Sequence, residues 1–281
     1  MTTRGGLGEK NRCTGPALAA AVLCLLLWSC SWFEEEEPRY VETPVEDLYN
    51  NAMDSLLVGD YFDAARLFDE VERQHPYSTW AAKAQLMAAF TYYQGNKYDD
   101  AINALDRFIQ LHPGNKDIAY AHYLRAISYY EQISDVGRDQ KNTRLALDAL
   151  EEVARRFPES RYARDVSLKI DLARDHLAGK HMEIGRFYLK QGEYLAAINR
   201  FQLVIQDYQT TTHVPEALHR LVESYLVLGV TDEAQATAAV LGHNYPGSPW
   251  YADSYVLLTG IDLRPEEYQG SWISRVWKSL I

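Results

Sequence analysis

Cysteine is almost absent from this chain. The three cysteines that it has, Cys13, Cys24 and Cys30, all lie within the first 30 residues. The rest of the sequence can therefore form neither a disulfide framework nor a cysteine-based metal site, and it offers no cysteine nucleophile. We expect the body of the protein to be stabilised by packing alone.

Positive charge is also scarce. The 281 residues include 28 lysines and arginines against 39 aspartates and glutamates, which gives a formal net charge of −11 at pH 7. No basic stripe offsets this excess. A phosphate backbone binds clustered positive charge, so the composition argues against a nucleic-acid partner.

Catalytic motifs are missing as well. The sequence contains no GxSxG, no HExxH and no phosphate-cradling glycine loop. His176 and His181 are five positions apart, a poor match to one helical face, and His219 with Glu223 is expected to form a surface hydrogen bond. The sequence predicts a protein that is not an enzyme and has no cofactor and no metal. An envelope hydrolase regulated by repeats would need a catalytic domain for which no residues remain.

What the chain does have is a repeated spacing of tyrosine, alanine and proline. In the clearest copy, Tyr92 lies 9 positions before Ala101, and Pro113 follows Ala101 by 12. One or both of these spacings recur in the other units, as the following pairs show: Tyr188 and Ala197, Tyr225 and Ala234, Ala64 and Pro76, Ala146 and Pro158, Ala234 and Pro246. This spacing is typical of tetratricopeptide (TPR) repeats. It predicts an all-α solenoid of five helix pairs, followed by a capping helix within residues 248–261.

Small residues recur at fixed places in the pattern. Two antiparallel helices approach closely only where small side chains meet, so we expect these residues to face one another within each pair. On the first helices they are Ala52, Ala89, Ala126 and Gly185; on the second helices they are Ala64, Ala101, Ala146 and Ala197.

Two units depart from the template. Unit 3 carries 8 additional residues between its helices, around residues 133–142, which are polar and are expected at one edge of the stack. Unit 4 has 14 additional residues before its first helix, about four helical turns, so the register of the packed face is kept. We therefore predict one long helix from Arg161 to Gln191, with Gly179 as a weak point.

Both ends of the chain differ from the repeats. Residues 1–29 have a positive head and an apolar run, Ala17–Trp28, too short to span a bilayer, and are interpreted as a lipoprotein signal peptide. Leu27–Cys30 (LWSC) resembles a bacterial lipobox, which predicts lipidation of Cys30; an ordinary cleaved signal or an uncleaved anchor are the alternatives. Residues 30–45 form an acidic tether. Residues 261–281 form an amphipathic tail that either caps the last unit or docks on a partner or a membrane surface.

Taken together, these features resemble the BamD-type lipoproteins of the outer-membrane β-barrel assembly machinery. The resemblance covers roughly residues 42–260. It rests on LWSC, on RFIQLHPGNKDIAYAHYLRA, on the insert VGRDQKNTRLAL and on the stretch from Ser160 to Phe201. It implies a non-catalytic, palmitate-bearing scaffold at the periplasmic face of the outer membrane of a Gram-negative bacterium. The implied partners are the periplasmic domains of the barrel-forming assembly subunit, small accessory lipoproteins and unfolded outer-membrane protein precursors.

The family further implies a division of labour between the repeats. Residues 46–131 would carry a groove for precursors, lined by positions 2, 5, 9 and 12 of the first helices, counted so that Ala52, Ala89 and Ala126 are position 8. These groove residues are Tyr49, Met53, Leu56, Leu86, Phe90, Tyr93, Tyr120, Tyr123, Ile127 and Tyr130. Residues 132–260 would bind the assembly subunit. The contact residues expected there are Arg186, Lys190, Arg200, His219 and Glu223.

One other function stays open at this point. A different periplasmic TPR lipoprotein, serving cell division, polysaccharide export or pilus assembly, would share the fold, the anchor and the charge. Co-purification of the barrel-forming subunit discriminates between the two interpretations.

Overall fold

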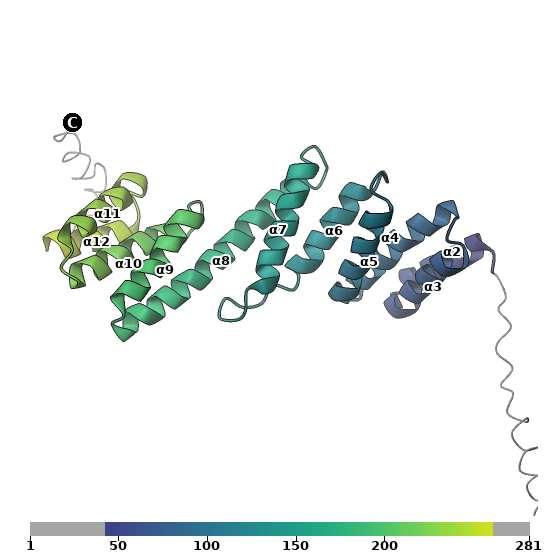
Figure 1. Ribbon diagram of the computed structural model, residues 1–281, viewed down its shortest axis with the longest axis horizontal. Helices are drawn as coiled ribbons and strands as arrows, with labels where there is room; N and C mark the ends of the chain where they lie inside the picture. Colours follow the sequence, from purple (N-terminus) through teal and green to yellow (C-terminus); the bar gives the residue numbers. More distant parts are fainter. Residues whose placement is uncertain (1–42, 261–281) are drawn as a thin grey trace, which may run out of the picture. The chain divides into compact units, whose positions relative to one another are not determined.

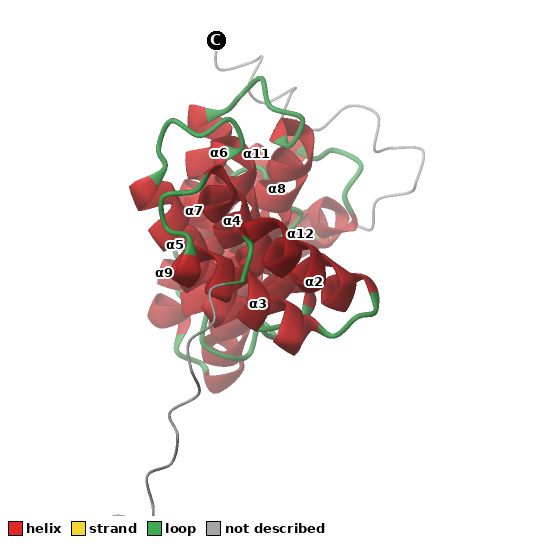
Figure 2. Ribbon diagram, turned by 90° about the vertical axis from the view of Figure 1, so that its right-hand side faces the viewer, coloured by secondary structure: helices red, strands yellow, loops and turns green. Residues whose placement is uncertain are grey.

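The structure, a computed structural model, describes residues 43–260. The chain divides into residues 1–43 and residues 44–281, and the described helices belong to the second of these units. All regular secondary structure in the described residues is helical (Figure 2). The helices are α2 (Val45–Leu57), α3 (Tyr61–Gln74), α4 (Thr79–Gln94), α5 (Tyr98–Leu111), α6 (Ile118–Tyr130), α7 (Lys141–Arg156), α8 (Ala163–Gln191), α9 (Tyr194–Asp207), α10 (Val214–Val227), α11 (Thr231–Asn244) and α12 (Pro249–Thr259).

Consecutive helices pair along the chain, as the repeat spacing predicts (Figure 1). Units 1 to 5 are α2 with α3, α4 with α5, α6 with α7, α8 with α9, and α10 with α11, and α12 packs on α10 and α11. Each unit buries its apolar face against its neighbours. The predicted TPR solenoid of five helix pairs with a further helix after them is confirmed. Within residues 43–260, none of the helices combines the length and the apolar character needed to cross a bilayer.

The turn inside a helix pair uses one residue in the left-handed region. This residue is Gly59 in unit 1, Asn96 in unit 2, Gly192 in unit 4 and Gly229 in unit 5, with φ values of 84°, 57°, 77° and 75°. All four occupy the same repeat position. Glycine adopts this conformation without a steric penalty, and asparagine tolerates it better than most residues.

The predicted small residues do lie at the helix crossings. The seven alanines at these positions are completely buried. Gly185 shows how close the approach is, because a Cβ atom added there would lie 2.4 Å from Cε1 of Phe201. Phe68, Phe108 and Phe201, one from each of three second helices, are fully buried and fill the space beside the crossings.

Helix α8 is continuous over 29 residues, as predicted from the length of unit 4. Gly179, predicted as a weak point, does not interrupt the helix. Gly179 is a buried helical residue, and a Cβ atom added to it would lie 3.2 Å from His213 Nε2. Val166, in the first part of α8, belongs to the core shared with α7. Met182, in the second part, belongs to the core shared with α9 and α10.

The insert of unit 3 connects α6 to α7 and is held against α8. The side chain of His176 hydrogen-bonds the carbonyl oxygen of Ser134 at 2.8 Å, and Lys180 Nζ donates to the carbonyl oxygen of Gly137 at 2.9 Å. Gln140 is buried, and its amide nitrogen donates to the carbonyl oxygens of Asp135 and Arg138, both at 3.1 Å. The polar composition of the insert therefore supplies its contacts with α8 as well as its solvated surface.

Candidate interaction surfaces

Position 5 of the first helices faces the next unit in three of the four cases that the sequence singled out. Tyr49, Leu86 and His219 are 5%, 9% and 4% exposed. The ring of Tyr49 lies 4.8 Å from that of Trp80 in α4, and His219 Nδ1 lies 2.8 Å from Ser254 Oγ in α12. The prediction that these three side chains line a binding surface is therefore wrong. They pack between successive first helices.

Ile127 is also buried. It is 4% exposed and packs in the core that α6 shares with α7 and α8. In unit 3 the long helix α8 covers position 9, because its extension brings its first turns beside α6. The groove set is thereby reduced to seven half-buried residues. They are Met53, Leu56, Phe90, Tyr93, Tyr120, Tyr123 and Tyr130.

A cluster of tyrosines forms the best-defined part of this surface. The rings of Tyr123 and Tyr162 stack with centroids 4.4 Å apart and an interplanar angle of 17°, and Tyr120 lies 5.7 Å from Tyr162. The hydroxyl of Tyr123 donates to Asp165 Oδ2 at 2.9 Å. Tyr162 and Asp165 belong to the start of α8 and were not anticipated from the sequence. The additional residues of unit 4 were the available signal, since they had to pack somewhere beside unit 3.

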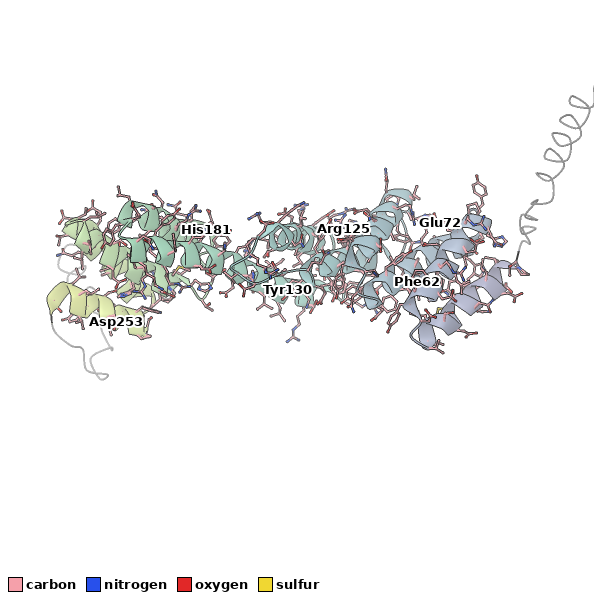
Figure 3. The ribbon with its side chains drawn as sticks, turned by 90° about the horizontal axis from the view of Figure 1, so that it is seen from below. Phe62, Glu72, Arg125, Tyr130, His181 and Asp253 are labelled. Carbon is pink, nitrogen blue, oxygen red and sulfur yellow. The ribbon has the colours of Figure 1, made fainter. Side chains whose placement is uncertain are left out.

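Two tyrosines of the cluster, Tyr120 and Tyr123, are kept uncharged at neutral pH. Burial raises the pKa of Tyr120 to about 12, and burial together with the hydrogen bond to Asp165 raises the pKa of Tyr123 further. At the edge of the cluster, Lys169 Nζ lies 5.1 Å from the ring centroid of Tyr130, which is labelled in Figure 3. The surface can therefore offer aromatic faces and phenolic hydrogen-bond donors to a ligand.

The predicted contact residues in units 4 and 5 do not form one cluster. Nη1 of Arg186 donates to both carboxylate oxygens of Glu216 at 2.9 Å, which joins α8 to α10. Glu223 accepts a hydrogen bond from Arg220 at 2.7 Å. Lys190 is exposed and Arg200 is half-buried on α9. Lys190 and Arg200 form no ion pair within residues 43–260, so of the five they are the most available to a partner.

The chain matches a known protein family over most of its length. The family model described as "YfiO: Outer membrane lipoprotein" matches residues 41–256. The chain belongs to the YfiO family. A relative from Caulobacter vibrioides, named outer membrane protein assembly factor BamD, is 54% identical over 226 residues, which cover 80% of this chain and 74% of the relative.

Two further YfiO relatives carry the same name. That of Rickettsia prowazekii is 48% identical over 85% of this chain and 95% of its own length, and that of Neisseria meningitidis serogroup A is 36% identical over 75% and 83%. Among solved structures, a TPR protein of Thermus thermophilus aligns at 20% identity over 77% of this chain and 98% of that chain, with a TM-score of 0.35. A similarity of that size carries no argument.

A network of ion pairs in this YfiO protein joins α5, α6 and α7. Arg125, labelled in Figure 3, donates to Asp106 at 2.9 Å and to Glu152 at 2.5 Å, and Glu152 also accepts from Arg156 at 2.8 Å. Burial opposes ionisation of Glu152, but the hydrogen bond from Arg156 and the charge of Arg125 lower its pKa overall. His122, 1% exposed, lies 3.6 Å from Glu152 and forms no hydrogen bond through either ring nitrogen.

His122 should make the stability of the protein sensitive to mild acid. Burial lowers its pKa from the usual 6.5 to about 4. Between these values the unfolded chain binds more protons than the folded one, so stability is present above pH 6.5 and is lost as pH falls toward 4. We expect His122→Leu to reduce the drop in Tm between pH 7.5 and pH 5, measured by circular dichroism. His243→Leu, at an exposed histidine of α11, is the control. Equal drops in the wild type and His122→Leu would contradict the assignment.

A cavity near these surfaces is formed around the insert. It has a volume of about 560 Å³ and lies between the insert, α8 and the start of α10. Its lining includes Tyr130 from the tyrosine cluster and Arg186 from unit 4, together with Asp135, Asp175 and His213. Asp175 is already engaged, since it accepts hydrogen bonds from the backbone nitrogen and hydroxyl of Thr212. In the part of the chain that the structure describes, no group of three or more potential ligands is arranged to hold a metal ion.

Proposed function

We propose that this chain is an outer membrane protein assembly factor, a non-catalytic scaffold of the β-barrel assembly machinery. The observation that carries the proposal is the 54% identity with the Caulobacter assembly factor over 80% of the chain. A tether from a lipid on Cys30 holds the scaffold at the periplasmic face of the outer membrane. Cys30 lies outside the described residues, so this part of the proposal rests on the sequence.

The half-buried groove of units 1 to 3 receives unfolded precursors of outer-membrane proteins. Its support is the aromatic surface formed by Tyr93, Tyr120, Tyr123 and Tyr130 and completed by Tyr162. Aromatic rings bury a large area with little loss of side-chain entropy, so they suit extended segments with aromatic side chains. The phenolic hydroxyls of Tyr93 and Tyr120, whose pKa values burial raises, add hydrogen bonds to a peptide backbone without adding charge.

Units 4 and 5 bind the periplasmic domains of the barrel-forming assembly subunit, and small accessory lipoproteins join the same assembly. Lys190 and Arg200 support this placement because neither belongs to an ion pair within the described repeats. Arg186 and Glu223 stabilise the scaffold through ion pairs with Glu216 and Arg220. Cationic side chains on an otherwise acidic protein direct a partner to one part of its surface.

A pull-down from detergent-solubilised envelopes tests whether the chain binds the barrel-forming subunit and whether Arg200 contributes to that contact. We expect the wild-type lipoprotein to recover the barrel-forming subunit and Arg200→Glu to recover at least about tenfold less, because repulsion replaces attraction at the interface. Lys97→Glu, a charge reversal at an exposed residue before α5, is the matched control and should bind normally. Partners are identified by mass spectrometry.

The alternative outcomes are separable. Unchanged recovery with Arg200→Glu would show that the contact lies elsewhere on the repeats, while the scaffold function would stand. Recovery of a cell-division, polysaccharide-export or pilus-assembly complex in place of the barrel-forming subunit would overturn the proposed function.

A further inference from the structure

The turn between α2 and α3 presents a concentrated apolar surface. Leu57, Val58 and Phe62 are 77%, 83% and 83% exposed, and Tyr61 beside them is 36% exposed. These four residues, which we call the apolar tip, lie within six consecutive positions of unit 1. Figure 3 labels Phe62, whose side chain extends from the first turn of α3. Large apolar side chains gathered on one turn indicate a site of contact with a protein or a membrane.

The fold does not require apolar residues at this turn. Leu57 occupies the same repeat position as Gln94 in unit 2 and Lys190 in unit 4, and both of these are exposed polar residues. The conformation of the turn comes from Gly59, with φ 84°, and from Asp60, whose carboxylate accepts a hydrogen bond from the backbone nitrogen of Asp63 at 3.1 Å. Unit 5 has a less exposed apolar turn, with Val227 at 60%, but it lies at the other end of the repeats.

The position of the tip along the chain points to a membrane as its partner. Pro44, at the start of unit 1, is 14 residues from Cys30. A chain of that length spans at most about 50 Å when fully extended. Such a tether therefore limits the distance of unit 1 from a bilayer that holds a lipid on Cys30 more tightly than it limits that of any later repeat. Its tip lies one helix away from Pro44, about 20 Å along α2.

We propose that the apolar tip inserts into the interface of the bilayer that holds the lipid anchor. The proposal rests on the lipid anchor of the proposed function. Leu57, Val58 and Phe62 reach below the phospholipid headgroups, and Tyr61 lies at headgroup level, where aromatic side chains with a polar end are favoured. A lipid on Cys30 holds the chain at one point only, so a second apolar contact limits the orientations of the repeats relative to the bilayer.

Site-specific fluorescence in vesicles tests this contact. The mature lipoprotein has no cysteine after Cys30, whose sulfur carries the lipid, so Leu57→Cys introduces a single reactive thiol. The thiol is labelled with nitrobenzoxadiazole, and the full lipoprotein is reconstituted in vesicles of phosphatidylethanolamine and phosphatidylglycerol. Gln94→Cys, at the same repeat position of unit 2, is the matched control. We expect a phospholipid with a nitroxide on its acyl chain to quench the probe at position 57 several-fold more than the probe at position 94.

Each of the other outcomes would contradict the proposal, and each would point to a different cause: no lipid anchor, no insertion of the tip, or binding of the tip to a protein. If the protein does not float with the vesicles, the lipid anchor is absent and the proposed contact falls with it. If the protein floats but both probes are quenched equally, the anchor stands and the tip does not enter the bilayer. If the probe at position 57 changes only when the barrel-forming subunit is added, the tip binds a protein instead. Adding Val58→Ser and Phe62→Ser to Leu57→Cys should reduce quenching of the probe at position 57, and unchanged quenching would also contradict insertion.

Discussion

Replacing Gly185 by alanine is expected to lower the free energy of unfolding by about 2 kcal/mol. The new Cβ atom would lie 2.4 Å from Cε1 and 2.8 Å from Cζ of Phe201, inside the contact distance of any pair of carbon atoms. Phe201 is fully buried, so its ring can move only by displacing α9 or neighbouring side chains. Overpacking typically costs about 1 to 3 kcal/mol, and a contact at 2.4 Å places this substitution at the upper end. The higher helix propensity of alanine returns about 1 kcal/mol, which leaves a net loss of about 2 kcal/mol. A decrease of about 4–8 °C in Tm follows for a domain of this size.

Gly179→Ala is the matched control for this prediction. It lies in the same helix and gains the same propensity, but its nearest neighbour is His213 Nε2 at 3.2 Å, at the end of a side chain that can adjust. We expect a change in Tm close to zero. Combining Gly185→Ala with Phe201→Leu should cost less than the sum of the two single substitutions, because the smaller side chain leaves room for the methyl group. Strict additivity, measured by calorimetry, would show that the two residues do not compete for one space.

Glu152→Ala, which removes a carboxylate from the network around Arg125, is expected to lower the free energy of unfolding by about 2 kcal/mol. Glu152 accepts hydrogen bonds from Arg125 and Arg156, and the Arg125 side chain is only 17% exposed. Without Glu152, Arg125 keeps Asp106 as its one carboxylate partner, and that carboxylate is half-exposed. Part of a charge is then left buried between α6 and α7 without compensation.

Glu151→Ala tests whether the loss depends on burial. Glu151 is the neighbouring residue of α7 and pairs with Arg174 at 2.6 Å, but both side chains are about 40% exposed. Exposed ion pairs contribute roughly 0–1 kcal/mol, so the midpoint of urea unfolding should change little. Equal effects of the two substitutions would show that the network around Arg125 contributes no more than a surface pair.

The fold could be predicted from the sequence as far as the spacing of the repeated residues allowed. The intervals between tyrosine, alanine and proline placed the helix pairs, and counting residues was enough to predict that α8 is continuous. The same counting failed at Tyr49, Leu86 and His219. Position 5 lies between successive first helices, and its exposure depends on how closely the next unit approaches. A repeat pattern within one unit carries no information about that distance.

Gly179 and Tyr162 show two further reasons why the structure could not be predicted fully from the sequence. Glycine lowers the helix propensity of α8, but packing against His213 and the insert outweighs this local preference. Tyr162 completes the aromatic surface from the start of α8, 39 residues after Tyr123, because the insert and the second helix of unit 3 return the chain to the same place. Contacts between distant residues of this kind depend on tertiary packing that neither periodicity nor composition describes.

Because α8 is continuous, its length sets the distance between the cores of units 3 and 4. Its 29 residues span about 43 Å, and they belong to the core of unit 3 at one end and of unit 4 at the other. Ordinary neighbouring repeats are joined by a turn and can flex at it, whereas here a bend would have to break backbone hydrogen bonds inside a helix. Under the proposed function, a precursor held beside Tyr162 and a subunit held beside Arg200 would be kept at a constant separation. In that case α8 would act as a spacer between the aromatic surface of unit 3 and the charged surface of unit 4.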